Sequence, residues 1–311
     1  MPESKPAAAA QDGHGAGVAF LLLALANLLW AGNNVVGRAV AELISPVALS
    51  FLRWVLAAAI LAPFLARPIW QHRALIRREW KVLLLLGATG IGAFHTFLYT
   101  GLAGTQAINA GLLLAATPVM IVLFTWVLFR EPVTMRQRAG IGLGLVGVAW
   151  LVSRGDPLAL AALDLRPGDG WVIAAAATWA LYSALLRLKP AGLPHFAFLG
   201  VTIVVGLAVL TPLFVAEQVV GTAFVPSQGA ILAIVFVALF PSILSYLAWN
   251  RGTVAVGANV AGLFMNLNPV FTAMLAILFL DEPLQGFHLI AFAAILGGLL
   301  LATRRGRETA A

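Results

Sequence analysis

Long apolar segments separated by short polar breaks run through nearly the whole chain. Each segment is continuously apolar and long enough to cross about 30 Å of hydrocarbon as a helix, whereas barrel strands would alternate polar and apolar residues. We predict ten membrane-spanning helices, at residues 17–40, 46–66, 80–102, 107–129, 136–153, 169–187, 195–215, 228–250, 258–280 and 286–303. The breaks carry turn-forming residues: Ser45-Pro46, Arg67-Pro68, Glu131-Pro132, Arg166-Pro167-Gly168, Lys189-Pro190 and Glu282-Pro283.

The composition agrees with these ten predicted spans, and it narrows the protein class to an all-α membrane protein. The chain has 311 residues, of which 61% are hydrophobic and 10% are charged. Soluble globular chains are nearer about 45–50% apolar and about 25% charged. These values exclude a soluble enzyme, a nucleic-acid-binding domain, a disordered protein and a secreted disulfide scaffold. Cysteine is absent, which excludes disulfides, thiolate nucleophiles and thiolate metal sites.

The formal net charge of +7 is typical either of a nucleic-acid-binding protein or of a membrane protein with basic cytoplasmic loops. Ten spans put both termini on one side, and 15 of the 19 Lys and Arg residues fall on that side. The exceptions are Arg38, Arg154 and Arg166 in loops on the other side, and Arg53 within a span. We therefore predict cytoplasmic termini and no nucleic-acid partner.

An internal repeat relates the two halves of the chain. A shift of 151 residues pairs Gly101 with Gly252, Pro118 with Pro269, Glu131-Pro132 with Glu282-Pro283, and Gly147 with Gly298; a shift of 149 pairs Trp30 with Trp179 and Arg38 with Arg187. Each half holds five spans, an odd number, so the halves are inverted relative to each other. Inverted repeats are typical of secondary transporters, whose substrate site lies near the midplane between the halves. We assign a cytoplasmic tail (1–16), a first repeat (17–155), an external linker (156–168), a second repeat (169–303) and a cytoplasmic tail (304–311).

These features resemble the EamA family of the drug/metabolite transporter superfamily. The resemblance rests on Phe129-Arg130-Glu131-Pro132 and Leu280-Asp281-Glu282-Pro283, on Pro118 and Pro269 about a dozen residues before each Glu-Pro, and on Trp30 with Asn33 and Asn34. Within the family the chain is most similar to YddG-type bacterial exporters of aromatic and other amino acids. The resemblance implies a multi-pass protein of a bacterial inner membrane that exports its substrate without ATP. The sequence agrees, because it contains no GxxxxGK[ST] phosphate-binding loop.

Polar and aromatic side chains within the spans are the candidates for contact with substrate, because polar groups are costly in lipid. Aromatic and polar residues four apart share a helix face in spans one, three, six and eight. The candidates are Trp30, Asn33 and Asn34 in span one, His95 and Tyr99 in span three, Trp179, Tyr182 and Ser183 in span six, and Tyr246 and Asn250 in span eight. Two alternatives stay open: interhelical hydrogen bonding, and an interfacial aromatic belt for Tyr99 and Tyr246.

The direction of each span sharpens the expected cavity. Asn33, Asn34, His95 and Tyr99 lie in the outer half, and Tyr182, Ser183, Tyr246 and Asn250 in the inner half. Trp30 and Trp179 lie nearer the middle, where we expect them to flank an apolar or aromatic substrate side chain. These faces suit a small amphipathic metabolite, and the resemblance implies that the substrates are amino acids or similar small metabolites.

Charge within the spans is scarce, and this bears on mechanism. His95 can be a proton site, a hydrogen-bond partner for substrate or a link between helices. Arg53 can snorkel outward, pair with Glu42 or another external acid, or hold a substrate carboxylate. We find no carboxylate deep in a span, and proton antiporters usually keep one. A facilitative exporter is favoured over a proton-coupled drug/metabolite antiporter of the same fold. An intramembrane enzyme is disfavoured, and we expect no catalytic residue, metal or other cofactor.

Three further features concern the helices themselves. Asn266 in span nine is a substrate candidate, and Pro118 and Pro269 lie within spans four and nine, where each predicts a kink or a hinge. Gly140-x-x-x-Gly144 in span five and Ala293-x-x-x-Gly297 in span ten permit close helix approach. This favours packing within the bundle over dimerisation, so we expect a monomer or a weak homodimer.

Overall fold

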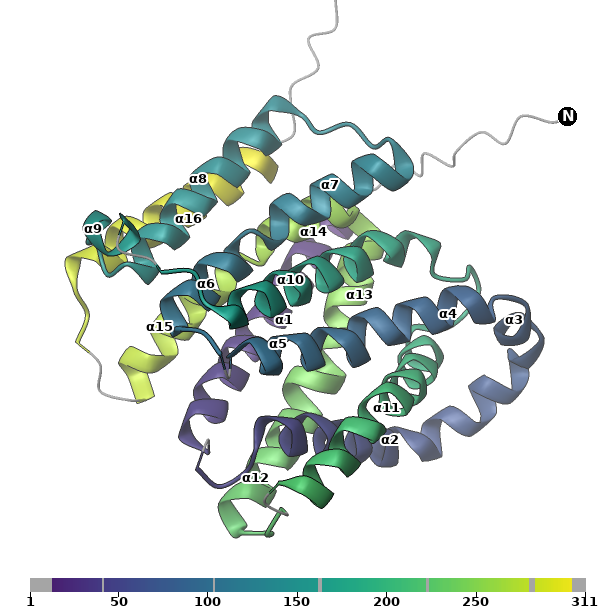
Figure 1. The fold of residues 1–311 in the computed structure, drawn as a ribbon. Coiled ribbons are helices and arrows are strands. Elements are labelled where there is room, and N and C mark those ends of the chain that lie inside the picture. Colours follow the sequence, from purple (N-terminus) through teal and green to yellow (C-terminus); the bar gives the residue numbers. More distant parts are fainter. Residues whose placement is uncertain are drawn as a thin grey trace, which may run out of the picture.

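The computed structural model describes residues 13–40, 42–102, 104–161, 164–221, 224–279 and 283–303, and every regular element in these ranges is a helix (Figure 1). The elements up to residue 161 are α1 (Gly13–Ala39), α2 (Pro46–Gln71), α3 (Arg73–Arg78), α4 (Trp80–Gly87), π-helix η1 (Ala88–Ala93), α5 (Phe94–Leu102), α6 (Ala107–Ala115), α7 (Thr117–Phe129), α8 (Met135–Val152) and α9 (Pro157–Ala161). Those that follow are α10 (Pro167–Leu185), the 3-10 turn η2 (Leu186–Leu188), α11 (His195–Val220), α12 (Gln228–Val237), π-helix η3 (Ala238–Leu244), α13 (Ser245–Val256), α14 (Ala258–Phe264), α15 (Leu267–Phe279) and α16 (Gly286–Thr303).

Nine helical segments among the described residues are long and apolar enough to cross a membrane. They correspond to nine of the ten predicted spans. The remaining predicted span forms α8, a helix of 18 residues whose first turn carries Arg136 and Arg138. These two charges shorten the apolar part of α8. An all-helical membrane protein is thus confirmed.

Some helix ends differ from the predicted span ends. The break placed at Arg67-Pro68 does not end the second span, since α2 runs through Pro68 to Gln71. Proline removes only one intrahelical hydrogen bond, and membrane helices tolerate it where neighbouring groups compensate. The helix ends where the His72 N–H donates to the Pro68 carbonyl at 3.1 Å, and α3 follows at once. The predicted linker 156–168 contains α9, and its last two residues, Pro167 and Gly168, already belong to α10.

Elements of the two halves correspond closely in position. Helices α2 and α11 are both 26 residues long and are offset by 149 residues, while α8 and α16 are both 18 residues long and are offset by 151. The third and eighth predicted spans each contain a π-helical segment, η1 and η3, at equivalent positions. Such segments often mark functional sites in membrane and soluble helices. Their shared position was not predicted, because their sequences ATGIGA and ALFPSIL have little in common.

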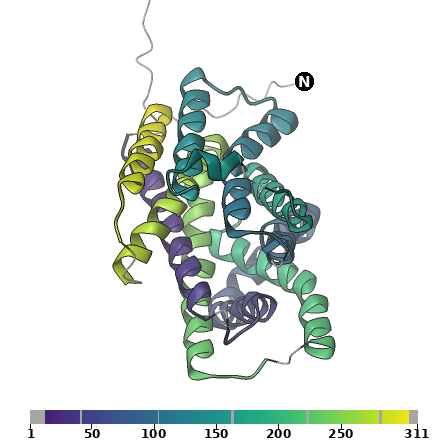
Figure 2. The same ribbon diagram turned by 60° about the vertical axis from the view of Figure 1, so that its left-hand side comes forward.

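The first helix of each half packs against helices of the other half. Helix α1 packs against α13 and α15, and the equivalent helix α10 packs against α5 and α7. In both ribbon views α1 runs through the middle of the bundle beside α13 (Figures 1 and 2).

The fourth and ninth predicted spans are interrupted. Span four divides into α6 and α7 at Ala116, and span nine divides into α14 and α15 near Met265. Pro118 lies in the first turn of α7 and Pro269 in the first turn of α15. Neither proline therefore lies within an unbroken helix. Proline fits the first turn of a helix, where its missing N–H leaves no hydrogen bond unmade.

Helices α8 and α16 lie side by side at one edge of the bundle, with their backbones in close contact (Figure 1). A methyl group added at Gly140 would lie 2.5 Å from the Gly298 carbonyl oxygen, and one added at Gly298 would lie 2.6 Å from the Gly140 carbonyl oxygen. Gly144 and Gly147 also face neighbouring helices closely. Gly140 and Gly144 thus serve packing within the chain. Ala293 is exposed instead, and a methyl group added at Gly297 would meet only Leu143 at 3.7 Å, so Gly298 is the glycine of α16 that contacts α8.

We expect Gly140→Leu to lower the unfolding temperature of the detergent-purified protein by several degrees. Overpacking of a close interface typically costs about 1–3 kcal/mol. Gly142→Leu is the matched control, because nothing lies within 4 Å of a methyl group added at Gly142 and leucine favours a helix over glycine. Equal shifts for the two variants would mean that the α8/α16 contact is not tight.

Candidate functional site

Six aromatic side chains meet at the centre of the bundle, and we call them the aromatic cluster. The members are Trp30 (α1), Trp54 (α2), Trp179 and Tyr182 (α10), and Tyr246 and Trp249 (α13). All except Trp30 are at most 3% exposed. Neighbouring rings have centroids 5.0–6.3 Å apart, mostly edge to face or tilted, as aromatic pairs prefer. Four members were candidates from the sequence, and Trp54 and Trp249 were missed.

Trp30 and Trp179 contact each other across the two halves. Their ring centroids are 5.2 Å apart and their planes are nearly perpendicular, at 88°. These two residues are equivalent in the internal repeat, so the contact lies where the pseudo-twofold relation would place it. Because the rings touch, no substrate side chain fits between them in this conformation.

Backbone carbonyls of the two π-helices accept hydrogen bonds from the cluster. The Trp30 indole N–H donates to the Pro241 carbonyl at 3.0 Å, and the Tyr246 hydroxyl donates to the Gly90 carbonyl at 2.7 Å. Tyr246 is therefore a central residue and not part of an interfacial belt. Gly90 has no room for a side chain, because an added methyl group would lie 2.5 Å from the Tyr182 ring.

The cluster is surrounded by buried polar atoms that have no partner among the described residues. They are the indole nitrogens of Trp54, Trp179 and Trp249, the Asn250 side-chain nitrogen and the Ser183 hydroxyl. The Asn250 side-chain oxygen accepts from the Tyr182 hydroxyl at 2.7 Å. Buried polar atoms are usually paired, so a group of unpaired ones at one place is typical of a site that receives a ligand or ordered water.

Arg53 and His95 lie beside Trp54 at the edge of the cluster. The Arg53 Nη2 lies 2.6 Å from the His95 Nε2, and the His95 Nδ1 lies 2.9 Å from the Ile91 carbonyl oxygen. The carbonyl can only accept, so Nδ1 carries the proton and Nε2 accepts from Arg53. Arg53 also donates to the Asn33 Oδ1 over a long 3.5 Å. The two side chains are 3% and 4% exposed.

Two of the expectations for Arg53 were wrong. A buried side chain does not snorkel to the membrane surface. Within the described residues no carboxylate forms an ion pair with Arg53, and Glu42 is exposed. The expectation of an external acid followed from sequence distance alone, whereas the rotation of α2 points the guanidinium at His95.

The other candidates lie outside the aromatic cluster. Asn34 is exposed and donates to Asn268 at 3.1 Å and to Thr272 at 3.2 Å, so it links α1 to α15. Asn266 is buried at the α14/α15 interruption, against Gly144 of α8. Tyr99 belongs to α5, but its side chain lies outside the described residues, as do Asp281 and Glu282.

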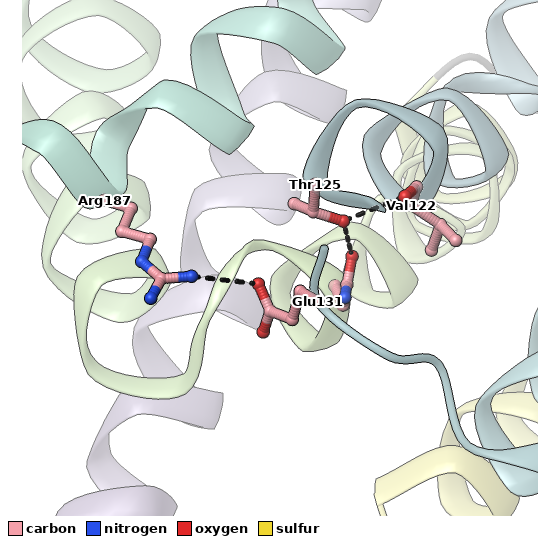
Figure 3. Close-up of polar contacts among 5 residues, drawn as sticks. Val122, Thr125, Glu131 and Arg187 are labelled. Carbon is pink, nitrogen blue, oxygen red and sulfur yellow. Dashed lines mark hydrogen bonds and ion pairs between the residues drawn. The ribbon is translucent and has the colours of Figure 1, made fainter. Parts of the chain in front are cut away.

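Two contacts join the halves at the end of the bundle predicted to face the cytoplasm (Figure 3). The Arg187 Nη1 lies 3.8 Å from the Glu131 Oε2, with 60% and 35% of the two side chains exposed. The Thr125 hydroxyl donates to the Asn259 Oδ1 at 2.5 Å. An exposed ion pair contributes only about 0–1 kcal/mol.

A buried carboxylate joins the halves at the opposite end, and the sequence reasoning did not single it out. Asp169 is 3% exposed and accepts from the Thr105 hydroxyl, from the Asn109 Nδ2 at 3.0 Å and from the Arg166 N–H at 2.8 Å. We call these four residues the Asp169 cluster. The capping box at the start of α10 gave a local signal for the Arg166 bond, but none for the contacts with α6 and the preceding loop.

Comparison of the chain with models of known protein families identifies its family. A family model described as the EamA-like transporter family matches the chain twice, over residues 17–153 and 166–304. The chain belongs to the EamA-like transporter family. Its two matches correspond to the two halves of the internal repeat.

Individual relatives are distant but span most of this EamA-like transporter. The uncharacterized transporter YyaM of Bacillus subtilis (strain 168) is 28% identical over 262 residues, which cover 83% of this chain and 85% of the relative. The aromatic amino acid exporter YddG of Ancylobacter novellus is 27% identical over 271 residues, which cover 85% and 90%. A crystal structure with 23% identity aligns with a TM-score of 0.78, covering 92% of this chain and 96% of the other, and supports the fold alone.

Proposed function

We propose that this protein is a secondary transporter that exports aromatic and other neutral amino acids by alternating access between its two halves. The proposal includes ten membrane spans in two inverted repeats, 17–155 and 169–303, with cytoplasmic termini and a bacterial inner-membrane location. The named activity of YddG supports the substrate class, and the positions of the basic residues support the orientation. Helix α8 would be the tenth span, because it packs along α16.

The observation that carries the proposal is the contact between Trp30 and Trp179 at the meeting point of the halves. Transporters with inverted repeats bind substrate near the midplane between the repeats. Here that place holds edge-to-face and tilted aromatic rings, together with indole N–H groups and an amide nitrogen that have no partner among the described residues. Aromatic surfaces suit an apolar side chain, and the polar atoms suit a small amphipathic molecule. Separation of the two tryptophans would open the space that the substrate occupies.

The polar chemistry favours a facilitative mechanism over proton coupling. The His95 Nε2 accepts from Arg53, so a proton added there would break this bond and would face a cation. Asp169 is occupied by three donors at the end of its span. Neither group is a free carboxylate deep in a span, which proton relays usually require. A proton-coupled drug/metabolite antiporter remains the second candidate, since His95 is buried beside the cluster.

Purified protein in liposomes tests both candidates. We expect saturable uptake of labelled tryptophan, phenylalanine, methionine or threonine, accelerated by unlabelled substrate inside the liposomes, because a carrier returns faster when loaded. An imposed pH gradient alone is expected to cause no accumulation. Accumulation against a substrate gradient, driven by the pH gradient, would establish the antiporter instead. Flux without saturation or exchange acceleration would indicate a channel.

A further inference from the structure

A cation without a counterion lies inside the membrane-spanning part of the protein. The Arg53 side chain is 3% exposed, its Nε has no partner, and no carboxylate among the described residues pairs with its guanidinium. Charged side chains in membrane spans are costly and normally pair with an opposite charge. The neutral partners, His95 and Asn33, leave the positive charge uncompensated.

The acids of the loop before α2, of α10 and of α11 are engaged or exposed. Glu217 of α11, which packs against α2, accepts from the Ser45 hydroxyl at 2.8 Å. Asp169 accepts from the donors of its own cluster. Glu42 is exposed in the loop before α2. The described part of the chain therefore holds no carboxylate for Arg53.

The internal repeat indicates that the fold itself does not need this charge. The 149-residue offset between α2 and α11 places Thr202 at the position equivalent to Arg53. The Thr202 hydroxyl donates to carbonyls of its own helix, Phe198 and Leu199, at 3.1 and 2.9 Å. A small, locally satisfied side chain therefore serves the same packing position in the other half. Arg53 is an addition on one side only.

Arg53 also lies within reach of the aromatic cluster. Its guanidinium carbon is 5.1 Å from the centre of the Trp54 ring, and Trp54 contacts Tyr246 with a centroid distance of 5.0 Å. A ligand whose acid group sits at Arg53 would thus extend an adjoining apolar part over the cluster. The planar guanidinium presents parallel N–H donors that match a carboxylate, and its Nε–H is already free.

We propose that Arg53 binds the carboxylate of the transported molecule and so restricts transport to amphipathic carboxylates. This inference rests on the proposed function, because it assigns one end of the same substrate. His95 is a positioning residue, since its Nε2 holds the Arg53 Nη2 and thereby orients the guanidinium. The single charge sets the carboxylate at the edge of the cluster and the apolar group toward Trp30 and Trp179.

The test measures ligand-induced thermal stabilisation of the purified full-length protein, with three probes: tryptophan, tryptophanamide and 3-indolepropionate. At a fixed ligand concentration, a ligand that binds only the folded state raises the unfolding temperature by an amount that grows with the logarithm of its affinity. In the wild type we expect the two carboxylates to bind at least about tenfold more tightly than the amide, which is about 1.4 kcal/mol. In Arg53→Gln the carboxylates should lose that advantage while amide binding stays the same. Arg53→Lys should fall between, because an ammonium cannot form the two parallel bonds.

Each outcome has a defined meaning. Equal binding of tryptophan and tryptophanamide by the wild type would overturn the proposal even if no Arg53 variant folds. Equal losses of acid and amide binding in Arg53→Gln would also overturn it, because that result indicates a structural role. Arg53-dependent binding of 3-indolepropionate without any amino-acid binding would support the carboxylate site and refute the proposed amino-acid substrates. The two proposals can therefore fail separately.

Discussion

Alanine at Trp30 or Trp179 is expected to reduce tryptophan and phenylalanine flux in proteoliposomes by at least about tenfold. The two rings form the contact between the halves, and each also contacts Tyr246 and Trp249. Removing one ring leaves a cavity and removes an aromatic surface that contributes about 0.5–1.5 kcal/mol beyond its buried area. Substrate loses the same surface, so flux of aromatic amino acids should fall more than flux of threonine.

The matched control is Trp126→Ala. Trp126 lies on α7, is 50% exposed, and stands outside the aromatic cluster, so its removal should leave flux near the wild-type value. Trp30→Phe and Trp179→Phe are further controls, because phenylalanine keeps an aromatic ring and so preserves much of the packing. A loss of flux in these variants would reflect a lost substrate contact and not a failure to fold. Unchanged flux of every tested amino acid in the alanine variants would refute a central site at these residues.

The internal repeat was the sequence feature that best predicted where the candidate site lies. Trp30 and Trp179 are equivalent in the repeat, so inverted copies are expected to bring both of them near the middle of the bundle. That reasoning needs no knowledge of side-chain contacts. Seven of the candidates lie in or beside the cluster: Trp30, Trp179, Tyr182, Ser183, Tyr246, Asn250 and His95.

The contacts between helices could not be read from the same pattern. Helices that are apolar all round carry no periodic signal for which face is buried. Trp54 therefore looked like any span residue, although it is fully buried against Tyr246. Asn34 stands one turn from Trp30, yet it faces α15 and bonds to Asn268. Sequence spacing places residues on one helix face, but only packing decides what that face meets.

Asp169 is buried although it lies at the end of a predicted span. The sequence gives no sign that Asp169 is buried, because it follows a Pro-Gly turn at the edge of an apolar segment. In the folded chain the Gly168 N–H donates to the Gly104 carbonyl at 3.2 Å, and this close approach covers the carboxylate. Donors then come from Thr105 and Asn109 of the first half.

Asp169→Ala is expected to lower the unfolding temperature more than alanine substitution of any other acidic residue near the end of a span. The substitution removes three accepted hydrogen bonds, leaves buried donors unpaired and takes away a helix cap, which together cost roughly 2–4 kcal/mol. The control is Asp156→Ala, because Asp156 is exposed and accepts only from the Leu158 N–H at 2.8 Å. Similar shifts for the two variants would contradict the importance of burial.

Asp169→Ala should also change the access of reagents to the interior. The Asp169 cluster ties the start of α10 to α6 and its preceding loop, so opening at that end must break it. The chain contains no cysteine, and Ser183 is fully buried, so Ser183→Cys supplies a single, nearly isosteric thiol. An impermeant maleimide added on the Asp169 side should label this thiol faster when Asp169→Ala is present. A lower unfolding temperature with an unchanged labelling rate would mean that the cluster supports the fold without closing the pathway.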